Sequence, residues 1–121
     1  MNKELKKKWL DALRGGGYKQ TRNALRDTDG FCCLGVLCDI LEKGKWGDGE
    51  YPDYKLDATS FLASGASGKK ILCTMLGMAE AEGIEQHIGN RLTNMNDGEG
   101  GPCYSFVEIA DYIEAKIPEN A

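Results

Sequence analysis

Apolar residues recur every three or four positions in five segments of the chain, which is the spacing of one face of an amphipathic helix. The first segment follows Asn2 and stops at the glycines of 15–17, and the second runs from Cys33 to a stop at Gly44. The remaining segments span 69–82, 84–95 and 105–117, and the segment from 84 is expected to stop near 96–98, Asn-Asp-Gly. The pattern therefore predicts helices in all five places, and the second one is expected to be the most buried.

The two terminal segments carry the strongest helix signals. Asn2 is a residue type that caps helices, and the apolar stripe that follows it leaves Lys6 on the polar side. Ser105 and Glu108 have the spacing of a capping box, in which each side chain bonds the backbone N–H of the other residue. The apolar stripe behind this box consists of Phe106, Ile109, Ala110, Ile113 and Ile117.

Between the first two helices the pattern changes to a near alternation of positions, which favours a β-strand from Tyr18 to Arg26. Residues 27–30, Asp-Thr-Asp-Gly, suit a turn, so Phe31 and Cys32 are expected to return as the second strand of a short hairpin. Because an isolated hairpin is only marginally stable, a third strand is expected from the region 51–56.

The stretch 45–68 is rich in glycine and has weak periodicity, so it is predicted to be a loop-rich excursion. A chain of 121 residues fits one domain with one core. The prediction is a single globular domain over 1–121 of α+β class, mainly helical. About four to five helices pack around a small antiparallel hairpin or short sheet.

The composition is ordinary for a folded protein, with 41% hydrophobic and 28% charged residues. The longest nearly apolar run, 31–37, is far too short to cross a bilayer, and the lysines near the N-terminus lead straight into an amphipathic pattern. A cytoplasmic location without membrane contact is the expectation.

Five cysteines are an odd number, and Cys33, Cys38 and Cys73 lie in apolar segments where a thiol packs as a small hydrophobe. Reduced cysteines in the core are therefore predicted. A zinc site needs paired cysteine spacings or two histidines, whereas this chain has a single histidine, His87. The sequence predicts no metal and no cofactor.

The net charge of −4 conceals an asymmetry along the chain. Residues 1–26 carry a charge of +6, and the remaining 95 residues carry −10. The basic segment either docks against the acidic remainder or faces an anionic partner. Binding of nucleic acid is disfavoured, because the net negative charge opposes a polyanion.

A candidate binding site lies on the predicted strand, where Tyr18, Gln20, Arg22 and Arg26 would share one face. Arginine side chains hold oxyanions in a bidentate manner and an aromatic ring stacks on a base, so this set suits a nucleotide-like anion. The structural alternative is that the arginines pair with acids of the protein, such as Asp27, Asp29 or Asp97, in an ordinary surface network.

A second polar cluster lies between the last two helices, where Asn94, Asn96 and Asp97 precede a glycine-rich loop. These residue types tolerate helix ends, so capping accounts for them. As an alternative, their amide and carboxylate groups could contact a ribose. Asn96 and Asp97 are therefore included among the candidate ligand-binding residues.

Three segments carry a resemblance: 18–26, Tyr-Lys-Gln-Thr-Arg-Asn-Ala-Leu-Arg; 30–39, Gly-Phe-Cys-Cys-Leu-Gly-Val-Leu-Cys-Asp; and Met-Asn-Asp at 95–97 followed by 105–114. They resemble an uncharacterised family of small proteins of phages and prophages. The resemblance spans most of the chain apart from 45–68 and supplies no catalytic residues. It implies an accessory, anti-defence role inside a bacterial host cell.

Joined to the arginine-bearing face, this context predicts a non-enzymatic protein that binds and sequesters a small anionic, nucleotide-like signal molecule. One alternative is an inhibitor that covers a host defence enzyme with its acidic surface. Another is a small thiol-dependent or nucleotide-processing enzyme using Cys32, Cys103 and His87. The expected partner is thus a small anion or a host defence protein, and a homo-oligomer is left open.

Overall fold

The computed structural model describes residues 1–77, 84–85 and 87–119. The described residues form five helices: α1 (Lys3–Arg14), α2 (Cys33–Leu41), α3 (Gly68–Leu76), α5 (Ile88–Asp97) and α6 (Phe106–Lys116). They also form three short strands, β1 (Lys45–Trp46), β2 (Tyr54–Lys55) and β3 (Phe61–Leu62). The predicted α+β fold, mainly helical with a small antiparallel sheet, is confirmed.

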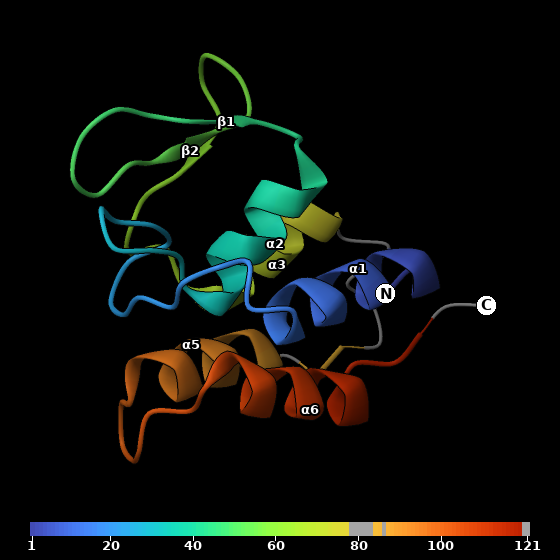
Figure 1. Cartoon of the computed structure of the whole chain (residues 1–121). Helices are drawn as coiled ribbons and strands as arrows, with labels where there is room; N and C mark the ends of the chain where they lie inside the picture. Colours follow the sequence, from blue (N-terminus) through green and yellow to red (C-terminus); the bar gives the residue numbers. More distant parts are fainter. Residues whose placement is uncertain (78–83, 86, 120–121) are drawn as a thin grey trace.

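Helix α2 lies at the centre of the helical part, where it contacts α1, α3 and α5. Six of its nine residues are buried, as the sequence predicted for the second helix. Helix α6 packs against α1 and α5, while α3 packs against α5 (Figure 1). The strands lie beyond one end of α2, far from α6 (Figure 1).

The sheet does not lie where the alternation placed it. Its strands run antiparallel in the order β1-β2-β3, entirely within the stretch 45–68 that was predicted to be loop-rich. Segment 18–26 forms no regular strand and has only isolated bridges, from Gln20 and from Arg26 to Phe31. The prediction of a hairpin at 18–32 is wrong, because side-chain hydrogen bonds in that segment replace ladder pairing.

The structure confirms both predicted helix caps. The Asn2 side chain accepts from the backbone N–H groups of Glu4 and Leu5, and Ser105 and Glu108 form the reciprocal capping box. Helix α3 ends at Leu76, where Gly77 takes a φ of 78° that favours glycine, so the predicted stop at Gly83 is too late. Most of the predicted extension, 78–82, lies outside the described residues.

Helix α5 begins at Ile88 rather than at residue 84, and it ends at Asp97, within the predicted stop at 96–98. Gly98 ends the helix with a φ of 79°. Asn96 and Asp97 thus form the last turn of α5, where their side chains bond to the segment 20–23.

Lys6 was predicted on the polar side of α1, but only 4% of its surface is exposed. Its ammonium group donates to the backbone oxygens of Ile117 at 2.6 Å and Glu114 at 3.1 Å. Because the last carbonyls of a helix lack partners within the helix, a buried cation at the end of α6 is well placed to satisfy them. Arg14 adds two ion pairs, to Asp111 and Glu114. Part of the basic segment thus docks on α6.

Helices α3 and α5 meet without side chains between them at one point. A β-carbon built on Gly68 would lie 1.8 Å from the backbone oxygen of Gly89, and one built on Gly89 would lie 2.7 Å from Gly68. Only hydrogen fits at both positions.

In the described part of the chain, no helix is long and apolar enough to cross a membrane.

We predict that Ile113→Ala lowers the free energy of unfolding by about 2–5 kcal/mol, because this fully buried side chain fills the core between α6 and its neighbours. The matched control is Val107→Ala in the same helix, where 51% of the side chain is exposed and the expected change is within about 0.5 kcal/mol. Urea unfolding measures both values, and equal losses would contradict the assigned core stripe.

Candidate functional site

The buried amide of Asn96 joins three parts of the fold that are distant in sequence. Its oxygen accepts from the Gln20 side chain at 3.0 Å and from the backbone N–H of Cys33 at 3.2 Å. Its nitrogen donates to the backbone oxygen of Thr21 at 2.8 Å and to the Asp97 carboxylate at 3.0 Å. Four hydrogen bonds use the full capacity of the amide, so Asn96 has no group left for a ligand.

Gln20 and Tyr18 are also held by the protein itself. The Gln20 amide donates a second hydrogen bond to the backbone oxygen of Tyr104 at 2.8 Å. The Tyr18 hydroxyl donates to Asp39, which also accepts from the Trp46 indole at 3.1 Å. Burial, followed by the bond to Asp39, raises the pKa of Tyr18 to about 12. Both side chains therefore anchor the segment 18–21 to the helices and the sheet.

The two candidate arginines differ from each other in their surroundings. The Arg26 guanidinium lies over the rings of Phe31 and Trp46, 4.9 and 5.3 Å from their centroids. Arg22 is exposed. Within the described part of the chain neither arginine forms an ion pair, so the predicted pairing with Asp27, Asp29 or Asp97 does not occur there.

The structure thus brings together three of the six predicted site residues, Gln20, Asn96 and Asp97. Tyr18 and Arg26 both contact Phe31 on the aromatic side of the segment, through an edge-to-face ring contact and through cation–π stacking. Without a strand, the four predicted residues of the segment 18–26 do not share one face.

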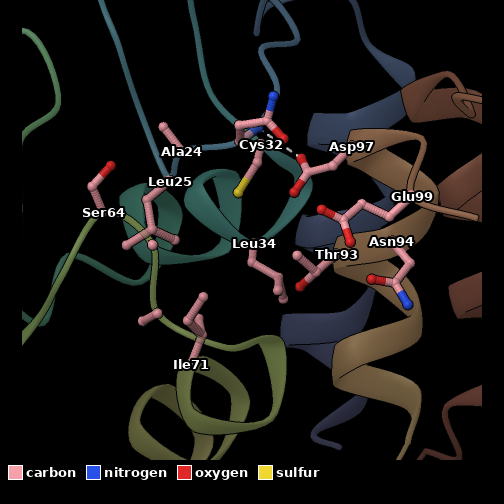
Figure 2. A pocket seen from close by; sticks show the side chains of 13 residues that line it. Ala24, Leu25, Cys32, Leu34, Ser64, Ile71, Thr93, Asn94, Asp97 and Glu99 are labelled. Carbon is pink, nitrogen blue, oxygen red and sulfur yellow. Dashed lines mark hydrogen bonds between the residues drawn. The ribbon is translucent and has the colours of Figure 1, made fainter.

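A pocket of about 270 Å³ lies beside Asp97, between the segment 23–25, the start of α2, the segment 64–66 and α5. Its lining residues are Asn23, Ala24, Leu25, Cys32, Leu34, Ser64, Gly65, Ala66, Ile71, Thr93, Asn94, Asp97 and Glu99. Figure 2 shows Thr93, Asn94, Asp97 and Glu99 along one side and Ala24, Leu25 and Ser64 along the other. Leu34 and Ile71 supply apolar surface between the two sides (Figure 2).

The polar lining is acidic. Asp97 and Glu99 carry carboxylates, and no lysine or arginine lines the pocket. Asp97 is fixed by the Asn96 amide and by the backbone N–H of Asn23 at 2.9 Å, where Asn23 adopts a φ of 64°. Such a lining accepts hydrogen bonds from hydroxyl and amino groups of a ligand and repels a phosphate.

The Cys32 sulfur lies among these residues (Figure 2), where it accepts from the backbone N–H of Gly35 at 3.2 Å and caps α2. Burial raises the pKa of this thiol to about 11, with a further increase from the Asp97 charge. Because the thiolate is the nucleophile, Cys32 is unreactive near neutral pH. His87 is exposed, pairs with Glu85 at 3.1 Å and does not line the pocket.

The polar cluster named from the sequence contains two lining residues of the pocket, Asn94 and Asp97, but the rest of the lining was missed. Ser64, Gly65 and Ala66 belong to the stretch with weak periodicity, and Thr93 and Glu99 flank the polar cluster. The signal that would have extended the prediction is the position of Thr93 and Glu99 beside that cluster at the end of one helix. Among the described residues, no group of three or more His, Cys, Asp or Glu side chains could hold a metal ion.

A family model described as a domain of unknown function, DUF8296, matches residues 1–117. The chain belongs to this family. The match extends over every described helix and strand. The domain of this family therefore includes the hydrogen bonds of Asn96 and the pocket. Searches of curated proteins and of solved structures gave no match.

We predict that Asn96→Ala lowers the free energy of unfolding by about 2–6 kcal/mol, because it leaves the buried Cys33 N–H and Thr21 C=O without partners at about 1–3 kcal/mol each. Asn94→Ala, two residues earlier in α5 and exposed, is the control and should change it by less than about 0.5 kcal/mol. If thermal and urea unfolding give similar values for the two variants, Asn96 does not hold the fold together.

The thiols give a second test. The exposed Cys103 should react rapidly with a thiol reagent at pH 7, whereas Cys32 should react slowly and speed up as the pH rises toward about 11. All five thiols should react after unfolding without reductant. The double variant Cys103→Ser with Cys73→Ser, which removes the exposed and the partly buried thiol, should have no fast phase. A fast phase that survives in it would show that a buried thiol is activated.

Proposed function

We propose that this protein is a non-enzymatic phage accessory protein that binds and sequesters a small, nucleotide-like molecule. The observation that carries the proposal is the pocket beside Asp97, whose lining combines apolar side chains with hydrogen-bonding groups. Concave sites in which polar groups converge beside apolar surface are the usual binding sites for small molecules. The phage context comes from the sequence resemblance.

The charge of the pocket changes the expected orientation of such a ligand. The carboxylates of Asp97 and Glu99 suit the hydroxyl groups of a ribose and the amino group of a base, since carboxylates are the residues that bind ribose hydroxyls in nucleotide sites. The apolar surfaces of Leu25, Leu34 and Ile71 suit the flat face of the base. A phosphate lies outside the pocket in this arrangement.

Binding by Arg22 and Arg26 stays a prediction. Arg22 directly precedes the lining residue Asn23, and neither guanidinium is neutralised by a carboxylate within the described part of the chain. An arginine without an acidic partner retains its charge-assisted hydrogen bonds for an anion. The corresponding variants, Arg22→Ala and Arg26→Ala, should weaken binding of a phosphate-bearing ligand by about 1.5–3 kcal/mol if these side chains hold the phosphate.

The state of the pocket thiol argues against the alternative of a thiol-dependent enzyme. An enzyme of the thiol-dependent kind needs an activated cysteine, and the buried Cys32 has its pKa raised rather than lowered. The basic partner that such a cysteine needs is not supplied by His87, which pairs with Glu85 at the surface.

The pocket is tested by filling it. Ala66→Phe places a ring in the lining and should weaken binding of the ligand at least tenfold, which is about 1.4 kcal/mol. The control is Ala63→Phe, at an exposed position outside the lining, which should leave the affinity within about twofold.

A thermal-shift screen with uncharged nucleosides and with nucleotides identifies the ligand, because a ligand at 100 times its dissociation constant adds about 2.7 kcal/mol to stability. Calorimetry then compares the two variants. Equal affinity of Ala66→Phe and the parent protein would overturn the pocket as the site. Chromatography of the recovered ligand should show it unchanged, and conversion to a product would overturn sequestration.

A further inference from the structure

The outer face of the small sheet carries a row of three exposed side chains that the fold does not use. Lys45 of β1 pairs in register with Lys55 of β2, and Lys55 pairs with Phe61 of β3. The alternate row, Trp46, Tyr54 and Leu62, faces the core, with Tyr54 and Leu62 almost fully buried. The two faces of the sheet are therefore clearly different in chemistry.

Two features of the outer row do not stabilise the fold. Lysines directly opposite each other on neighbouring strands repel, and such like-charge pairs destabilise a sheet. Phe61 leaves 52% of its surface exposed to water, which makes it one of the most exposed large hydrophobic residues in the described part of the chain. A pair of cations beside an exposed ring has the chemistry to bind a ligand that carries negative charge and a flat apolar surface.

Neither lysine of the row is neutralised by the protein. Within the described residues, Lys45 and Lys55 form no ion pair. A hollow of about 450 Å³ adjoins the two lysines and is also lined by Lys43, Glu42 and Asp57, while Phe61 lies outside this lining. The three lysines outnumber the two carboxylates, so the lining carries a net positive charge, unlike that of the pocket beside Asp97. Lys43 is already bound to the backbone oxygen of Met75 at 2.6 Å, and Asp57 accepts from the backbone N–H groups of Thr59 and Ser60.

The spacing of the row defines the size of the ligand. Neighbouring strands lie about 4.8 Å apart, so the ring of Phe61 is one strand from Lys55 and two strands from Lys45. The row offers one ring for stacking and two ammonium groups, which matches the single base and the phosphate of one nucleotide. Sheets that bind single-stranded nucleic acid instead stack successive bases on several aromatic side chains.

We propose that the outer face of the sheet is a second binding site, which takes a planar aromatic molecule bearing a phosphate, such as a nucleoside monophosphate. The base stacks on Phe61, and the phosphate lies between the ammonium groups of Lys45 and Lys55. This site is separate from the pocket beside Asp97 and opposite to it in charge. This proposal does not depend on the proposed function of that pocket.

The probe for this site is adenosine 5′-monophosphate, titrated into the isotope-labelled full-length protein and followed by NMR. The expected result is a set of saturable shifts at the backbone amides of 45, 55 and 61, which disappear as salt is raised because exposed charges are screened. Adenosine alone and inorganic phosphate alone should each bind at least tenfold more weakly. Absence of shifts at these amides at millimolar probe would overturn the proposal.

The variant that tests the charges is the double substitution Lys45→Ala with Lys55→Ala, which should weaken binding of the probe at least tenfold. Its control, Lys69→Ala with Lys70→Ala, removes the same charge from exposed positions at the start of α3 and should change the affinity less than twofold. Equal losses in both double variants would overturn the site, because they would show a general effect of net charge.

The melting temperature of the lysine double variant and substitutions of Phe61 provide two further tests. Because the Lys45–Lys55 pair repels, its removal should leave the melting temperature unchanged or raise it, so weaker binding is not explained by unfolding. Phe61→Tyr should keep the affinity and Phe61→Ala should lose it. A short single-stranded oligonucleotide that binds where the monophosphate does not would overturn the small-ligand proposal.

Binding in the two places is told apart by the variants. Ala66→Phe should leave the salt-sensitive binding of the monophosphate to the sheet unchanged, whereas the Lys45/Lys55 double variant should leave binding to the pocket unchanged. Loss of monophosphate binding in Ala66→Phe alone would assign the probe to the pocket and overturn the sheet site.

Discussion

The fold depends on one buried side-chain amide, whose donors and acceptors must all have hydrogen-bond partners. Asn96 has no exposed surface, and its four hydrogen bonds connect α5 to the start of α2 and to the irregular segment 20–21. A buried polar group without partners is costly, so the amide tolerates only an arrangement in which all three segments meet. This requirement explains why 18–26 holds a fixed path without pairing as a strand, and why the pocket forms beside Asp97.

The sequence predicts well those features that depend on local chemistry. The caps at Asn2 and Ser105 are correct because the side chain and the backbone N–H groups it bonds are three residues apart or fewer. The apolar stripe that includes Ile113 is correct for the same reason, since helical periodicity is a local property. Gly77 shows the limit of such local predictions. A glycine within a helical pattern ends the helix only where the surrounding fold requires the chain to turn, and this requirement is not visible in the local sequence.

What the sequence does not predict depends on partners far along the chain. Gln20 and Asn96 are 76 residues apart, and Lys6 binds the carbonyl of Ile117 at a separation of 111 residues. An alternation of residue types cannot distinguish a strand from a segment whose side chains bond to distant helices. Strand β2 lies within the region 51–56, where a strand was expected. Strands β1 and β3 were not predicted, because two residues are too few to establish a period. The pocket was missed since its walls come from four separate segments.

The contact between Gly68 and Gly89 has a consequence beyond the packing of two helices. Ile71 stands one turn after Gly68 on α3, and Thr93 stands one turn after Gly89 on α5, and both line the pocket. The width of the pocket at this end is thus a length fixed by backbone atoms in direct contact rather than by side chains that adjust. Variation elsewhere in the lining would alter which molecule the pocket prefers. The width of the pocket at this end stays constant for as long as residues 68 and 89 both remain glycine.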